Sequence, residues 1–370
     1  MQSDNPQNTN KETTIIGLFF ELIKCGIGKQ EKLPCPPDTH QWNELFEIAK
    51  KQTLTGIAFA GIERLPQEQR PAKALLLQWY HLSSIIKNKN SELNKKSAIV
   101  SKKFKSEGFA NCILKGQGIA QLYPDPTLRT PGDIDIWLDG GDSKAIEYAK
   151  RYFPDCKPTY HHVDFPITAD LDIEIHYRPT WMYNPLTNSK LQKYFASIAK
   201  RQFSNIVDTP EGSFPVPSTD FNRIYILLHI YRHLFFEGIG MRQVLDYYFV
   251  MQQGMDTAEK QEYIATLKAL GLTKFAGALT YVMQQMFGLD QEHTTVKPNA
   301  KMGKFLLREI MIAGNFGKYD SRYDLGAHEY TFKRATETIR RNLTLLTRYT
   351  NETLWSPYFK IWHYFWRKRH

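Results

Sequence analysis

The sequence has few cysteines and no long apolar run, and both absences narrow the class of protein. The four cysteines, Cys25, Cys35, Cys112 and Cys156, are scattered, and no two have the spacing of a zinc finger or a CxxC motif. No apolar stretch approaches the roughly 20 residues that a membrane helix needs, and the polar amino terminus lacks the pattern of a signal peptide. We therefore expect a cytoplasmic protein with reduced thiols.

Internal repeats and low-complexity segments are also missing, so a solenoid or a largely disordered chain is not expected. The composition, 42% hydrophobic and 13% aromatic, is that of a folded globular protein, but 370 residues exceed one compact core. The pattern of apolar residues predicts four segments. They are a disordered tail at 1–12, an N-terminal helical region at 13–107, a core at 108–180, and a mainly helical C-terminal region at 181–370.

The positive charge is unevenly distributed. Of the formal net charge of +10, much lies between Lys301 and His370, which contain 14 Lys or Arg and 6 Asp or Glu. A solvated basic face explains this pattern, and so does attraction of phosphate-bearing substrates. The segment Tyr358–His370 mixes aromatic and basic residues, which favours packing of a terminal helix but leaves a partner or a peripheral membrane contact open.

The central segment departs from the helical pattern near Gly108. An apolar run ends at Lys115-Gly116, which predicts a strand that enters a turn and then a helix. Further strands are expected at 133–138, 160–167 and 171–177, with a helix at 143–152 and a hairpin turn at 168–170.

Carboxylates alternate along two of these predicted strands. Because side chains alternate across a strand, Asp133 and Asp135 point to one face, and Asp172, Glu174 and His176 also share a face. Like charges at this spacing repel unless a cation offsets them, and oxygen ligands suit Mg²⁺ or Mn²⁺. The alternative is an edge strand whose aspartates only face water.

These motifs resemble those of a known family. The sequence is similar to the bacterial uncharacterised nucleotidyltransferase family of the DNA polymerase β-like superfamily, over roughly residues 15–290. The segments that carry the resemblance are 114–124, 129–136, 173–178, 229–234 and 240–246. The resemblance implies an α+β fold, with a small mixed-sheet polymerase β-like core flanked by N-terminal and C-terminal helical regions.

The resemblance also implies roles for individual residues. Asp133 and Asp135 would be metal ligands, and Glu174 would be the third catalytic carboxylate, with Glu in place of the superfamily's usual Asp. The superfamily's Gly-Ser turn appears here as Lys115-Gly116, whose lysine and backbone amides would hold phosphates. Mg²⁺ or Mn²⁺ is the implied cofactor.

The resulting hypothesis is a Mg²⁺-dependent nucleotidyltransferase that moves a nucleoside monophosphate from an NTP to an acceptor hydroxyl. The acceptor stays open between a small molecule, a sugar and a protein. The alternative is a non-catalytic relative that binds nucleotide or a partner. Nucleic acid is not expected as a partner, because no motif for that role is present.

Several polar residues permit more than one interpretation. Arg129 is expected to bind phosphate or to pair with the strand aspartates or with Asp125. His229 and His233, four apart on a helix, favour packing over a substrate pocket, because no Glu follows the first His as in zinc proteases.

Two further expectations concern charge. Arg242 and Asp246 are spaced to pair on one helix. Replacing Asp133 and Asp135 by Asn is expected to leave the fold intact, because it removes repulsion between like charges.

Overall fold

The computed structural model describes residues 6–167, 172–323 and 332–369, except the side chains of 6–14 and 332–335. The helices are α1 (Pro6–Gly26), α2 (Thr39–Lys51), α3 (Thr55–Arg64), α4 (Lys73–Ser106), α5 (Gly116–Ala120), α6 (Gly141–Tyr152), α7 (Pro185–Gln202), α8 (Thr219–Phe236), α9 (Met241–Gln252), α10 (Thr257–Ala269), α11 (Thr273–Phe287), α12 (Ala300–Ala313), α13 (Phe332–Leu345) and α14 (Thr350–Arg367). The strands are β1 (Asn111–Leu114), β2 (Ile134–Leu138), β3 (His162–Asp164), β4 (Ile173–His176), β5 (Ile206–Thr209) and β6 (Gly212–Pro215).

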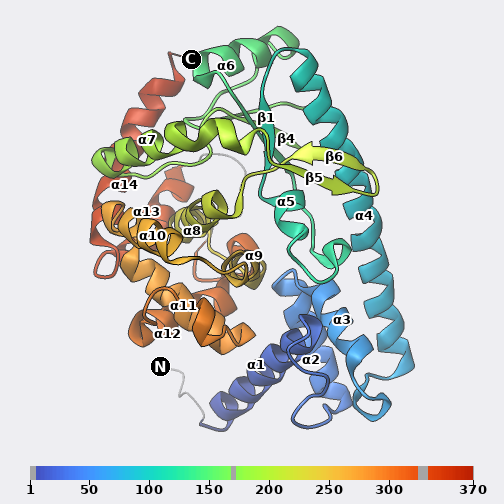
Figure 1. Cartoon of the computed structure of the whole chain (residues 1–370). Coiled ribbons are helices and arrows are strands. Elements are labelled where there is room, and N and C mark those ends of the chain that lie inside the picture. Colours follow the sequence, from blue (N-terminus) through green and yellow to red (C-terminus); the bar gives the residue numbers. More distant parts are fainter. Residues whose placement is uncertain (1–5, 168–171, 324–331, 370) are drawn as a thin grey trace.

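A small mixed sheet lies among these helices (Figure 1), which confirms the predicted α+β class. Its strand order is β1-β2-β4-β3, with β2 and β4 parallel and both outer pairs antiparallel. The predicted pairing of the last two strands is confirmed, although the turn expected at 168–170 lies outside the described residues.

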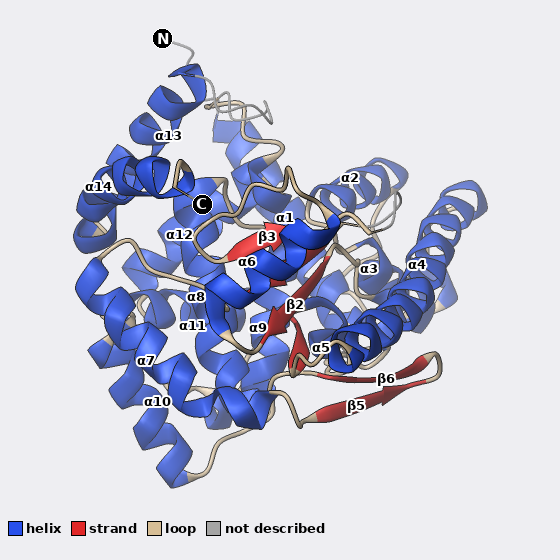
Figure 2. Ribbon diagram, turned by 90° about the horizontal axis from the view of Figure 1, so that it is seen from above, coloured by secondary structure: helices blue, strands red, loops and turns tan. Residues whose placement is uncertain are grey.

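The two faces of the sheet are covered by different helices (Figure 2). One face presents Ile136 and Ile175 to a core shared with α4 and α6. The other face carries Trp137, which stacks on Phe221 of α8 with ring centroids 5.7 Å apart. Alternation along β2 therefore turns Asp135, two positions before Trp137, toward the C-terminal helices.

Helix α4 joins the N-terminal helices to the sheet. It runs along one side of the molecule from α3 to β1 (Figure 1). Its side chains Leu93, Val100 and Phe104 belong to the same core as the strands. The segment 13–107 therefore supplies part of the core of the segment that follows it.

Three features differ from the sequence-based expectations or add to them. Helix α1 begins at Pro6, so residues 6–12, predicted as a disordered tail, have a helical backbone continuous with the apolar run that follows. The hairpin of β5 and β6 was not predicted, because its residues are largely exposed and show no clear alternation. No helix in the described part of the chain is long and apolar enough to cross a membrane.

Candidate active site

Two of the three predicted carboxylates, Asp135 and Glu174, meet because β2 and β4 are parallel and in register. Asp135 pairs with Glu174 across the two strands, and both side chains lie on the face turned toward α8. His176 bridges them, since its Nε2 lies 2.7 Å from Asp135 Oδ1 and 3.1 Å from Glu174 Oε2. Asp133 directly precedes β2 and is exposed, and it is not among the described groups whose ligand atoms lie within 4.8 Å of one another.

The turn after β1 places a lysine against these carboxylates. Lys115 Nζ lies 2.8 Å from Asp135 Oδ2, so this residue lies beside the carboxylates as expected. Its backbone adopts φ 52° and ψ −134°, a conformation that strongly favours glycine and stores strain at a non-glycine residue. Gly116 follows with φ 27°, and α5 starts there.

Asp135 is buried but charged. Burial opposes ionisation, yet Lys115 and His176 outweigh it and hold the pKa of Asp135 well below its usual range. Burial lowers the pKa of His176, but its hydrogen bonds to Asp135 and Glu174 outweigh burial and raise this pKa to about 8. Both oxygens of Asp135 are therefore engaged by cationic or hydrogen-bonding partners.

Asp133 differs from Asp135 in both the direction of its pKa shift and its exposure. The negative charge of Asp135, with a smaller contribution from burial, raises the pKa of Asp133 to about 6. Its carboxylate is exposed and lines a small cavity of about 30 Å³ together with Lys115 and Asp135. Asp133 is thus the carboxylate that is open to an incoming cation or substrate.

The arginines of this cavity are arranged differently from the expectation. Arg129 forms a bidentate pair with Asp246, at 2.7 and 2.8 Å, rather than with Asp125 or the strand aspartates. The expected pair of Arg242 with Asp246 is not formed; Arg242 donates instead to the carbonyl of Thr130 at 2.8 Å. Asp246 is 117 residues from Arg129, so only the tertiary fold reveals this pair.

Arg242 is a site residue for which the sequence predicted only a pair within its helix. It lines the cavity, and no ion pair to it is found within the described residues. Burial, followed by repulsion from Arg129, lowers its pKa. A buried cation without an anionic partner is suited to bind an anionic group.

Two histidines were also missed. His161 Nε2 lies 3.1 Å from His162 Nδ1, and His162 Nδ1 lies 3.1 Å from Glu174 Oε2. Burial lowers the pKa of His162 to about 4 and that of His161 well below its usual range. The only sequence signal was the strand itself, whose alternation puts His162 on the face of its cross-strand partner His176.

The two histidines of α8, His229 and His233, have different surroundings. His229 lines the charged cavity, and its ring centroid lies 4.4 Å from that of His233. His233 packs against Phe316 at 4.9 Å. The packing interpretation therefore fits His233, whereas His229 faces the cavity.

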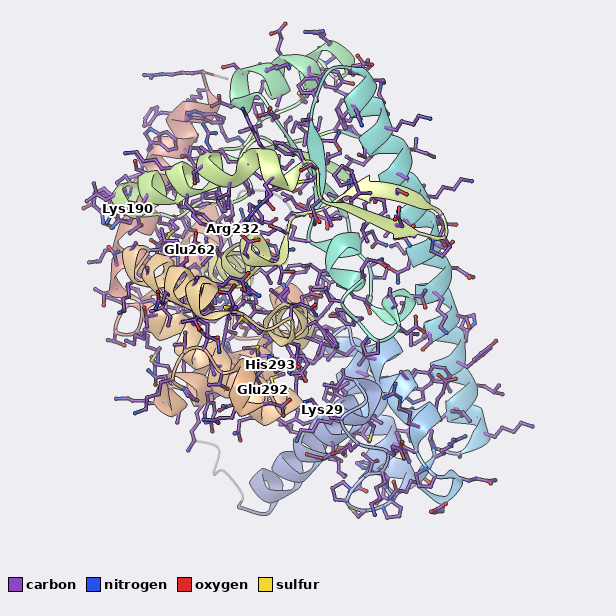
Figure 3. All side chains as sticks on the ribbon, in the orientation of Figure 1. Lys29, Lys190, Arg232, Glu262, Glu292 and His293 are labelled. Atoms are coloured by element: carbon purple, nitrogen blue, oxygen red, sulfur yellow. The ribbon has the colours of Figure 1, made fainter. Side chains whose placement is uncertain are left out.

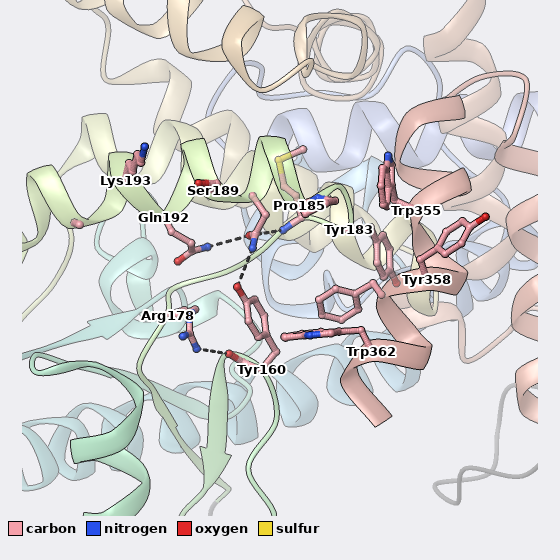
Figure 4. A pocket seen from close by; sticks show the side chains of 14 residues that line it. Tyr160, Arg178, Tyr183, Pro185, Ser189, Gln192, Lys193, Trp355, Tyr358 and Trp362 are labelled. Atoms are coloured by element: carbon pink, nitrogen blue, oxygen red, sulfur yellow. Dashed lines mark hydrogen bonds between the residues drawn. The ribbon is translucent and has the colours of Figure 1, made fainter. Parts of the chain in front are cut away.

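A second and larger cavity, of about 740 Å³, lies between α7 and α14 (Figure 4). Its walls are mainly aromatic and include Tyr160, Trp355 and Trp362. The two cationic side chains that line it are Arg178, which pairs with Asp142 at 2.7 Å, and Lys193. This aromatic pocket is connected to Asp135 through successive contacts of Trp181, His161 and His176.

Comparisons with known proteins identify a family for this chain. Residues 38–288 match the sequence model of a family described as uncharacterised nucleotidyltransferase. No curated protein matches the chain. Among solved structures, the chain is similar to an antigenic nucleotidyltransferase-like protein from Paracoccidioides brasiliensis, with 13% identity and a TM-score of 0.32. That match covers 57% of this chain and 96% of the other.

Proposed function

The chain belongs to the family of uncharacterised nucleotidyltransferases, and we propose that it transfers a nucleoside monophosphate from an NTP to an acceptor hydroxyl. The observation that carries this proposal is the register of β2 and β4, which sets Asp135 beside Glu174 with Asp133 at the start of the same strand.

The carboxylate set fits a hard divalent cation, Mg²⁺ or Mn²⁺. Asp133 is open, and Asp135 and Glu174 each offer oxygens on the same face of the sheet. These three residues would hold the ion, which when bound would neutralise charge on the reacting phosphate. Asp135 can contribute fully only if Lys115 gives up its contact with this carboxylate.

Lys115 and Arg242 are the cations positioned to bind the triphosphate. Both line the cavity beside Asp133, whereas Arg129 is held by Asp246 and acts as a support for the loop before β2. In the reaction, the acceptor oxygen forms a bond to the α-phosphorus and the bond to the leaving pyrophosphate breaks. The hydroxyl proton passes to Glu174 or Asp172. Holding the reactants in line supplies much of the rate.

Two observations favour the alternative of a non-catalytic relative. The ammonium of Lys115 already neutralises Asp135, and the cavity of about 30 Å³ is far smaller than a nucleotide. Catalysis therefore requires Lys115 and its neighbours to move when the nucleotide binds. Neither observation distinguishes between a small molecule, a sugar and a protein as the acceptor.

The test is incubation of the protein with each α-labelled NTP, Mg²⁺ and a cell extract as the acceptor pool. We expect a labelled product and release of pyrophosphate with one NTP, and a loss of at least a thousandfold in Asp133→Asn. Asp139→Asn, at an exposed position just after the same strand, is the matched control and should retain full activity. Absence of Mg²⁺-dependent pyrophosphate release with all four NTPs would favour the non-catalytic alternative.

A further inference from the structure

Strands β3 and β4 place four ligand-type side chains on one face of the sheet. In the antiparallel register, His162 is opposite His176 and Asp164 is opposite Glu174. Each strand thus supplies one imidazole and one carboxylate, two positions apart and on the same side. β3 is an edge strand of the sheet, and its Asp164 is exposed.

The ligand atoms of these residues converge. His162 Nδ1 and His176 Nε2 both lie 3.1 Å from Glu174 Oε2. His162 Nε2 lies 3.9 Å from Asp164 Oδ1. One atom each from His162, Asp164 and Glu174 lies within 4.8 Å of the others, and the same holds for Asp135, Glu174 and His176. Glu174 is therefore common to both groups.

Burial separates an inner and an outer part of this cluster. The side chain of His176 is 2% exposed, and its Nδ1 has no hydrogen-bond partner within the described part of the chain. Asp164 is 76% exposed, so an ion can reach the cluster from solvent on that side. A buried imidazole behind an exposed carboxylate gives a metal site an entry path from solvent.

His161 does not belong to this ligand set. Its Nε2 accepts a hydrogen bond from Arg232 at 2.6 Å, and a guanidinium so close opposes a second cation on that nitrogen. Within the described residues, the nitrogens of His162 contact His161 and the two carboxylates and form no hydrogen bond with a guanidinium.

The donor set decides the kind of ion. Mg²⁺ and Ca²⁺ prefer oxygen ligands only, whereas imidazole with carboxylate suits borderline divalent metals. We propose that the β3–β4 face binds a divalent transition metal of the class of Zn²⁺ and Co²⁺ through His162, Asp164 and Glu174, with His176 hydrogen-bonded to Glu174 behind them. The ion would offset the repulsion between the facing carboxylates Asp164 and Glu174. Glu174 is common to this site and to the carboxylate set proposed for Mg²⁺, whereas His162 and Asp164 belong to this site alone.

The experiment uses the full-length protein after treatment with a chelator and contains no NTP. Co²⁺ is added, and its visible absorption reports nitrogen and oxygen ligation. We expect one bound ion, displaced by equimolar Zn²⁺ and retained in a hundredfold excess of Mg²⁺. His162→Ala and Asp164→Asn should each weaken Co²⁺ binding at least tenfold. Asp164→Asn alters an exposed side chain, so it remains informative if His162→Ala fails to fold.

An unrelated surface cluster provides the control. Asp290, Glu292 and His293 also lie within 4.8 Å of one another, and Figure 3 shows Glu292 and His293 near Lys29, away from Arg232. His293→Ala should leave Co²⁺ binding unchanged. The proposal is wrong if His293→Ala abolishes binding, if Mg²⁺ displaces Co²⁺ at similar concentrations, or if both strand variants bind Co²⁺ as tightly as the natural protein.

Discussion

The charged cavity around Asp135 and the aromatic pocket between α7 and α14 differ in size and in what stabilises them. The charged cavity measures about 30 Å³ and the aromatic pocket about 740 Å³. In the first, side chains are held by buried ion pairs such as Lys115 with Asp135. In the second, rings stack, as Phe359 does on Trp181 at 4.1 Å. The larger of these two cavities is therefore not the one in which the ionisable groups converge.

The difference also predicts how each region responds to substitution. Removing one member of a buried ion pair leaves an uncompensated charge, so the loss is large. Removing one ring from a partly open cluster loses only its own contacts, so the loss is small. The predictions below compare the two regions, from the largest expected effect to the smallest.

Asp135→Asn should destabilise the protein by about 3–5 kcal/mol, because the ammonium of Lys115 loses its buried partner. Asp133→Asn should leave the free energy of unfolding unchanged or slightly increased, because it relieves repulsion at an exposed position. The sequence alone predicted that both substitutions are tolerated, and the burial of Asp135 limits this prediction to Asp133. Chemical denaturation of both variants provides the measurement.

Equal stability of these two variants would show that the pair between Lys115 and Asp135 is not buried in solution. The double variant Lys115→Met with Asp135→Asn sharpens the test. It should recover part of the stability lost in Asp135→Asn, because neither charge is then left alone.

The next largest effect on stability is expected for Glu352 of α14, which lies at the border of the aromatic pocket. It accepts hydrogen bonds from the backbone N–H groups of Tyr183 and Asn184, and burial raises its pKa from 4.5 to about 7. The folded state thus binds the proton more tightly than the unfolded state. The stability due to this group is fully present below pH 4.5 and is lost as the pH rises through 7, by on the order of 3 kcal/mol.

Glu352→Gln should remove this pH dependence, because an amide does not titrate. The quantity to measure is the difference in unfolding free energy between the natural protein and the variant at pH 5 and at pH 8. The natural protein should lose stability relative to the variant at the higher pH. A difference that stays constant over this range would mean that the carboxylate of Glu352 is solvated.

The smallest effect is expected for single rings of the aromatic pocket. Phe359→Ala should cost about 1–2 kcal/mol, because Phe359 stacks on Trp181 and is partly buried. Tyr358→Ala, at the neighbouring position with 68% exposure, should change stability by no more than about 0.5 kcal/mol. Thermal unfolding would measure both. A loss for Phe359→Ala as large as that for Asp135→Asn would break the contrast between the two regions.

Much of the fold and part of the candidate site follow from local sequence patterns. Alternation correctly placed Asp135 and Glu174 each on a polar strand face, and the apolar run before Lys115 located the turn beside them. The α+β class, which the family resemblance implied, was confirmed. Periodicity alone separated the helical segments from the strands. The predicted catalytic and metal-binding roles of these residues stay predictions.

The remaining features depend on contacts between distant segments. Asp135 pairs with Glu174 only because β2 and β4 are parallel and in register, and no local pattern specifies that alignment. The partner of Arg129 proved to be Asp246, on a helix far along the chain. His162 was overlooked because its significance arises from the strand opposite, not from its neighbours in sequence.

Helix α4 has a consequence for how the chain unfolds. At 34 residues it extends about 50 Å, with its first half against the N-terminal helices and its last turns in the core of the sheet. A fragment that begins at residue 108 would leave that core without Phe104 and Val100. The two segments that meet at Gly108 should therefore melt in one cooperative transition, and the change of sequence pattern at this glycine is not a position at which the chain can be cut into independently folding parts.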